Sequence, residues 1–218
     1  MNYVCYWDAC RFTNWLDNGQ PTGAQGVGTT ETGAYTLNGY DGRTIQRNAG
    51  WTWAVTSEDE WYKAAWHKND GVTGNYFDYP TSSNTAPGRD LADASGNNAN
   101  YYDGDGSIPI DPRYYTTVVG EFQDSDSPYG TFDQGGNVWE WTEAVIIVDG
   151  SHADRVARGT SAYMDVDSLR PPPRDGCGPG SASESPGLGF RVSEVPEPAT
   201  LALPALGGPA LLRHRRSY

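Results

Sequence analysis

The sequence predicts an α+β domain with two helices, short antiparallel strands and long irregular loops. Two segments space their apolar residues as helices do, and several short segments have the pattern of strands. Between them the chain is rich in loop-forming residues, with 27 glycines among 218 residues. Tyrosine (14) and tryptophan (8) are plentiful. Since long apolar helical stripes are few, we expect aromatic side chains to build the core of one domain.

The first helix is expected over residues 7–16. Four residues at helical spacing form its predicted inward face: Ala9, Phe12, Thr13 and Leu16. An Asn-Gly pair follows and ends the helix. Cys5 stands near the N-terminal cap position, where a hydroxyl would pair with Asp8 in a capping box, and a thiol is a poor substitute acceptor.

The second helix follows a clearer start signal. Ser57 and Glu60 have the spacing of a capping box, and three acidic residues occupy the first turn. Trp61, Ala64 and Ala65 form the predicted inward face. A buried tryptophan on a helix is expected to act as a packing anchor.

Strands are predicted around residues 137–142, 155–159 and 189–192, with further strand positions at Tyr35, Leu37, Thr44 and Ile45. Residues 69–127 are nearly all loop by composition. A structureless passage of this length is uncommon in a compact domain, so something must hold it. A bound metal ion is one physical answer.

The charge of the chain excludes some functions. The formal net charge is −13, which argues against binding to nucleic acid or to anionic membranes. Three cysteines, Cys5, Cys10 and Cys177, give no complete disulfide framework. Three scattered histidines make no zinc set.

Four sequence motifs carry a resemblance to a known family. Residues 136–141 are Gly-Asn-Val-Trp-Glu-Trp, residues 155–159 are Arg-Val-Ala-Arg-Gly, and residues 187–191 are Gly-Leu-Gly-Phe-Arg. Residues 57–65 are Ser-Glu-Asp-Glu-Trp-Tyr-Lys-Ala-Ala. Residues 1–194 therefore resemble the formylglycine-generating enzyme domain, also called the sulfatase-modifying factor domain. The resemblance implies the variant of the C-type-lectin fold that this family adopts.

The resemblance also implies two structural calcium sites. The first would use the Asn100 side chain, the Tyr101 carbonyl, the Asp111 carboxylate and the Arg113 carbonyl, pinning both ends of the long loop together. The second would use Asp133, the carbonyls of Gly136 and Val138, and Glu140. Calcium prefers six to eight such hard oxygen ligands. The alternative for Glu140 is an internal salt bridge with an arginine such as Arg158.

The same resemblance argues against catalysis. In the enzyme, two thiols shortly after an Arg-Gly-Gly-Ser-Trp segment hold copper(I), for which soft thiolates are natural ligands. Residues 158–162 here are Arg-Gly-Thr-Ser-Ala, and the thiol positions fall at or near Met164 and Leu169. Cys177 stands alone further on. Copper is therefore not expected, and no catalytic residue is predicted.

Residues 195–218 resemble a bacterial PEP-CTERM sorting tail, which sorting machinery recognises. Pro-Glu-Pro at 196–198 precedes a 14-residue apolar run and a basic end. That run is shorter than the roughly 20 residues of a spanning helix. Residues 1–4 show no signal peptide. We therefore expect that the domain is truncated at its N-terminus, and that it is exported or associated with the cell envelope if the true start carries a signal.

Together these observations predict a non-catalytic, calcium-stabilised binding or structural domain at the cell surface. Its expected partner is an unidentified protein or polysaccharide ligand. One alternative is a copper-dependent oxidase that converts a cysteine of a sulfatase to formylglycine. A second alternative is a truncated, decayed gene product.

Overall fold

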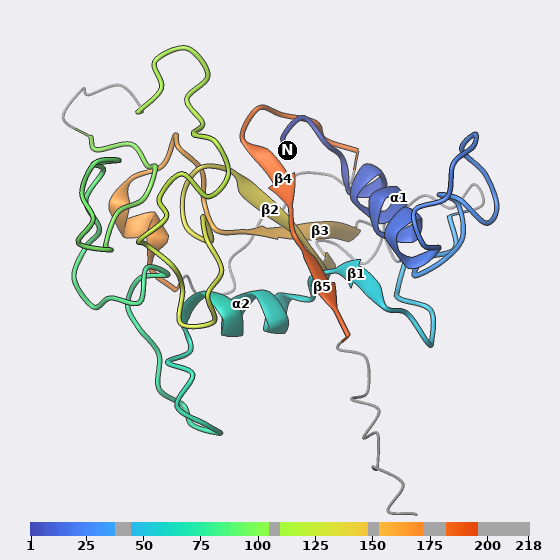
Figure 1. Ribbon diagram of the computed structural model, residues 1–218, viewed down its shortest axis with the longest axis horizontal. Helices are drawn as coiled ribbons and strands as arrows, with labels where there is room; N and C mark the ends of the chain where they lie inside the picture. Colours follow the sequence, from blue (N-terminus) through green and yellow to red (C-terminus); the bar gives the residue numbers. More distant parts are fainter. Residues whose placement is uncertain (38–44, 105–109, 148–152, 172–181, 196–218) are drawn as a thin grey trace, which may run out of the picture.

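The computed structural model describes residues 1–37, 45–104, 110–147, 153–171 and 182–195 (Figure 1). Thr44, Cys177 and the tail from residue 196 onward lie outside these ranges. The elements in chain order are α1 (Tyr6–Asp17), β1 (Trp53–Val55), α2 (Glu58–Trp66), β2 (Trp139–Ile147), β3 (Ala153–Arg158), the 3-10 helix η1 (Val166–Leu169), β4 (Leu188–Phe190) and β5 (Val192–Glu194). The α+β class is confirmed. No helix in the described part of the chain is long and apolar enough to cross a membrane.

The strands form two small sheets that share the C-terminal segment. β1 pairs antiparallel with β5, and β2 lies between β3 and β4. β3 is antiparallel to β2, but β4 is parallel to it, so the expectation of antiparallel pairing is wrong for β4. The single strand expected over residues 189–192 is divided at Arg191 into β4 and β5, which join different sheets (Figure 1).

Helix α1 begins at a cap that works through Asp8. The Asp8 carboxylate accepts hydrogen bonds from the backbone N–H of Cys5 (3.1 Å) and from its thiol (3.0 Å). The thiol thus serves as a donor, and the carboxylate satisfies the free N–H at the helix start. The inward face differs from the expected one. Ala9 and Thr13 are buried as expected, but Phe12 and Leu16 are only partly buried.

A polar side chain replaces the expected apolar residues on the inner face of α1. Asn14 is fully buried and donates to the backbone carbonyls of Thr30 and Tyr35, while its oxygen accepts from the Tyr35 N–H. These bonds fix the segment before residue 38 against the helix. Tyr35, Leu37 and Ile45 are buried in the core, but none of them lies in a strand, so the strand prediction for these positions is wrong.

Helix α2 confirms the capping box. The Ser57 hydroxyl accepts from the Glu60 N–H (3.1 Å), and the Glu60 carboxylate accepts from the Ser57 N–H (2.8 Å). Trp61 is fully buried and meets the ring of Trp66 edge-on at 5.2 Å. The tryptophan is therefore a packing anchor, as predicted.

The long passage from residue 69 to residue 127 has neither helix nor strand in its described part. Buried polar side chains bind its backbone instead. The side-chain oxygen of Asn98 accepts from the Asp90 backbone N–H, and the backbone N–H of Asn98 donates to the Ser125 hydroxyl. The Tyr101 hydroxyl donates to the Pro87 carbonyl at 2.8 Å. The passage is therefore held in part by its own side chains.

Candidate functional site

The Trp-Glu-Trp segment at the start of β2 sends its side chains to opposite faces. Trp141 is fully buried against Tyr6, with ring centroids 6.1 Å apart, and its indole N–H donates to the Val4 carbonyl. Glu140 is also buried, but its carboxylate points toward α2 and the C-terminal strands. The strand alternation thus separates an apolar anchor from a charged one.

Glu140, which is buried, forms an ion pair with the partly buried Arg191. The guanidinium of Arg191 donates through Nε to Oε2 (2.5 Å) and through one terminal nitrogen to Oε1 (2.7 Å). The indole N–H of Trp61 also donates to Oε2, at 2.6 Å. Such a two-point pair is among the stronger hydrogen-bonded contacts in proteins. Arg158 pairs with Glu58 on α2 instead. Glu140 therefore has the internal salt bridge of the alternative interpretation, but its partner is Arg191 and not Arg158.

The other members of the second predicted calcium set lie just before β2. The Asp133 carboxylate accepts from the Gly120 N–H at 2.6 Å. Burial raises the pKa of Asp133, against the opposing effects of that N–H and of Arg191. Gly136 has a positive φ of 80°, and Val138, which is partly buried, directly precedes the strand.

Gly136 is in direct contact with Asn100, a residue of the first predicted set. A β-carbon at position 136 would lie 2.2 Å from the Asn100 carbonyl oxygen. The same carbonyl accepts from the Asn137 N–H at 2.8 Å. Only glycine allows this approach together with the positive φ. The structure therefore brings one member of each predicted set together.

The first predicted set surrounds Tyr115. Asn100 donates through its amide to the Tyr115 carbonyl at 2.9 Å, and the Tyr115 N–H donates to the Asp111 carbonyl at 2.8 Å. The Asp111 carboxylate accepts from the Arg113 N–H at 2.7 Å. Tyr101 is buried and Arg113 is exposed. The two halves of the set, far apart in the loop, thus meet at one residue.

The side-chain oxygen of Asn100 has no hydrogen-bond partner among the described residues, although Asn100 is only 1% exposed. Buried polar atoms are nearly always bonded, and an exception requires a physical reason. An oxygen in this position is a suitable ligand for a hard cation.

The positions of the copper thiols hold no sulfur ligand of the required kind. Met164 is 40% exposed, and Leu169 is buried at the end of η1 among Tyr79, Ala99 and Tyr101. Leu169 belongs to a packed apolar cluster. Cys5 and Cys10 are free, buried thiols near α1, and Cys177 lies outside the described residues.

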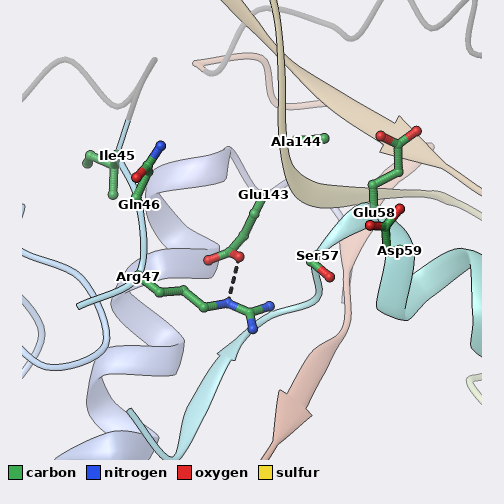
Figure 2. A pocket seen from close by; sticks show the side chains of 8 residues that line it. All are labelled: Ile45, Gln46, Arg47, Ser57, Glu58, Asp59, Glu143 and Ala144. Carbon is green, nitrogen blue, oxygen red and sulfur yellow. Dashed lines mark ion pairs between the residues drawn. The ribbon is translucent and has the colours of Figure 1, made fainter. Parts of the chain in front are cut away.

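A separate pocket of about 430 Å³ lies between the segment before β1, the start of α2 and the middle of β2 (Figure 2). Its lining residues are Ile45, Gln46, Arg47, Ser57, Glu58, Asp59, Glu143 and Ala144. Figure 2 shows Arg47 reaching toward Glu143, with Glu58 and Asp59 across the opening. The pairing of β2 and β3 shifts register between Trp141 and Val145, and this irregularity carries Glu143.

Two charged residues of the pocket wall, Arg47 and Glu143, bind each other. Arg47 pairs with Glu143 (2.6 Å) and with Glu60 (2.7 Å), and it stacks on the ring of Trp51 at 4.2 Å. The Tyr35 hydroxyl donates to Glu143 and accepts from the Val55 N–H at 3.1 Å. No sequence motif marks Arg47 or Glu143, because their pairing depends on the register shift in β2. The network joins α2, β1 and β2.

The pKa values follow from this network. Burial raises the pKa of Glu143, although Tyr35 and Arg47 oppose the shift. Burial also acts to raise the pKa of Glu60, but hydrogen bonds from Arg47 and the Ser57 N–H outweigh it and lower the value to about 2. Glu60 is therefore charged in the folded protein at all but very acidic pH.

Comparison with known proteins places the chain in a structural class and a family. Solved structures with the same fold include CarF, with a TM-score of 0.58 at 24% identity over 89% of this chain and 67% of that chain. Another is variable protein 1 of Treponema denticola, with a TM-score of 0.54 at 22% identity over 88% of this chain and 69% of that chain. At these identities the likeness concerns the fold.

Residues 1–195 match the family model of the sulfatase-modifying factor enzyme 1-like domain, and the chain belongs to that family. A comparison with curated protein sequences gave no match. The family expected from the four sequence motifs is thus confirmed.

Breaking the Glu140–Arg191 pair should destabilise the domain strongly. In calcium-free buffer, Glu140→Gln leaves the partly buried Arg191 charge without its partner, and we expect a loss of about 3 kcal/mol in the free energy of unfolding, the lower end of the range for a buried pair. Urea unfolding followed by tryptophan fluorescence measures it. The double variant Glu140→Gln/Arg191→Met removes both charges and should be less destabilised than the sum of the two single variants. If the double variant loses as much free energy of unfolding as the two single variants together, the two residues are not energetically coupled.

Glu60 should make the stability of the domain depend on acid pH. Its folded-state pKa of about 2 lies below its usual value of 4.5, so the unfolded chain takes up the proton first. The stabilisation is complete above about pH 4.5 and is lost as the pH falls toward 2. Glu60→Gln keeps a capping-box residue and should show a shallower fall in midpoint temperature between these values. Asp59→Asn, at an exposed neighbour, should retain the parent slope, and equal slopes in all three proteins would contradict the assignment.

Proposed function

We propose that this chain is a non-catalytic, calcium-stabilised binding domain that works at the cell envelope. The buried side-chain oxygen of Asn100, which has no hydrogen-bond partner among the described residues, is the observation that carries the proposal. A calcium ion held by Asn100, Tyr101, Asp111 and Arg113 would give that oxygen a partner. It would also fix the largely exposed turn at residues 111–115 to the buried segment that contains Asn100.

The two predicted calcium sets differ in chemical fit. In the first set the Asn100 oxygen is free to coordinate, and the Asp111 carboxylate accepts only backbone N–H bonds among the described contacts. In the second set Glu140 already binds Arg191 and Trp61. A calcium ion bound at Asp133, Gly136, Val138 and Glu140 would therefore share the Glu140 carboxylate with the guanidinium of Arg191. We propose the first set as the stronger site and the second as a weaker one.

The proposal that the domain is non-catalytic is supported by the residues at the copper positions. A thioether at Met164 and a packed aliphatic side chain at Leu169 cannot form the two-thiolate site that holds copper(I) in the enzyme. Leu169 also contacts the core, so a thiol there would leave a cavity. These substitutions leave a scaffold without the chemistry of the oxidase.

An aromatic surface next to the first set supports a binding role. The rings of Tyr115 and Tyr163 lie 5.3 Å apart, both side chains are exposed, and Tyr3 is close enough to influence Tyr163 electrostatically. Exposed tyrosines offer flat apolar faces with a polar tip, which suits both sugar rings and peptide ligands. We propose that this surface contacts a protein or polysaccharide ligand at the cell surface, and that sorting machinery handles the PEP-CTERM-like tail of residues 195–218.

Calcium should raise the stability of the full chain. At a calcium concentration one hundred times the dissociation constant, a native-state site adds about 2.7 kcal/mol. Asp111→Asn keeps the side-chain acceptor for the turn but removes the charge, and should abolish most of the shift in midpoint. Asp126→Asn, at an exposed aspartate of the same long loop, should leave the shift intact. A midpoint that is the same in chelator and in excess calcium would overturn the calcium proposal.

The non-catalytic assignment predicts no aldehyde. After incubation of the chain with copper(I), oxygen and a cysteine-containing sulfatase peptide, mass spectrometry should show the peptide unchanged. Formation of formylglycine would favour the oxidase instead. A chain with no cooperative thermal transition at any calcium level would favour the decayed gene product.

A further inference from the structure

Three side chains outside the sites above converge on one point near the N-terminus. The Cys5 sulfur and one carboxylate oxygen from each of Asp8 and Glu184 all lie within 4.8 Å of one another. No residue of this group belongs to the two predicted calcium sets or to the pocket around Arg47. The three residues come from two segments that are far apart in the sequence.

The fold brings these segments together through backbone contacts. The Tyr3 N–H donates to the Ser185 carbonyl at 3.0 Å, and the Asn2 amide donates to the Pro186 carbonyl at 2.8 Å. These bonds hold the chain before α1 against the chain before β4. Cys5 and Asp8 are fixed to each other by the two hydrogen bonds at the start of α1. The convergence is therefore built by the backbone.

The electrostatics of the group favour a bound cation. Two carboxylates held this close repel each other, and Arg11 contacts Asp8 only from one side, at 3.8 Å. Glu184 forms no hydrogen bond or ion pair with another described residue. Cys5 is buried, Asp8 is partly exposed and Glu184 is exposed. An ion from solvent would therefore reach the two carboxylates first and then the sulfur.

The donor set selects the kind of metal. A thiolate is a poor ligand for calcium and magnesium, which prefer oxygen alone, whereas zinc accepts both sulfur and carboxylate oxygen. Zinc bonds of about 2.0–2.3 Å in a tetrahedron place donors about 3.3–3.7 Å apart. The Cys5 sulfur and an Asp8 oxygen are 3.0 Å apart, so they need to separate by only a few tenths of an ångström, and exposed Glu184 has room to move inward.

We propose that Cys5, Asp8 and Glu184 form a zinc site with its fourth position open to water. On binding, the sulfur–metal bond replaces the S–H bond, and the thiol proton leaves to solvent. Three protein ligands and one open position are typical of zinc sites that can accept a further ligand.

Cobalt(II) is the probe for this site, because a cobalt–thiolate bond produces a near-ultraviolet charge-transfer band. The tag-free full chain, reduced and kept in excess calcium to fill hard-ligand sites, is titrated with cobalt. We expect one equivalent to produce the band and one equivalent of zinc to remove it. Glu184→Gln should weaken cobalt binding by roughly tenfold or more.

Cysteine variants identify the sulfur. Cys5→Ser should abolish the band and retain the near-ultraviolet circular dichroism of the parent, since serine can still hydrogen-bond to Asp8. Cys10→Ser and Cys177→Ser should keep the band. The proposal is overturned if cobalt gives no band, or if the band survives in Cys5→Ser. It is equally overturned if Glu184→Gln, at an exposed residue, binds cobalt as tightly as the parent. None of these results depends on whether calcium stabilises the domain.

Discussion

The ion pair between the buried Glu140 and the partly buried Arg191 is the contact on which the arrangement of the domain depends. Glu140 lies on β2, Arg191 separates β4 from β5, and Trp61 reaches the same carboxylate from α2. Arg191 also donates to the Phe132 carbonyl in the loop before β2. The pair therefore joins the two sheets, a helix and a loop. Charges at this depth are tolerable only when each is paired and hydrogen-bonded.

A second polar network gives the other side of the domain its shape. The register shift in β2 carries Glu143 toward Arg47, which in turn holds Glu60 at the start of α2. With short strands and few apolar stripes, the domain has limited apolar area to bury. Directional ion pairs and aromatic contacts between elements therefore define positions that packing alone would leave loose.

The long irregular loop is where stability and the proposed function meet. Its buried asparagines bind backbone groups, yet the side-chain oxygen of Asn100 has no partner among the described residues. A cation there would tie the turn that displays Tyr115 to the chain beside β2. Stabilising the loop and shaping the tyrosine surface would then be one event, and ligand and calcium would each strengthen the binding of the other.

The sequence by itself determined the α+β class, the family and both helices, because capping, helical spacing and short motifs are local signals. It also raised an internal salt bridge between Glu140 and an arginine as one alternative for that residue. It did not identify Arg191 as the partner, the parallel pairing of β4, or the strand β1. Asn14 on the inner face of α1 and Glu143 in β2 were missed for the same reason. Each of these depends on which distant segment supplies a hydrogen bond or an opposite charge, and only the tertiary structure decides that.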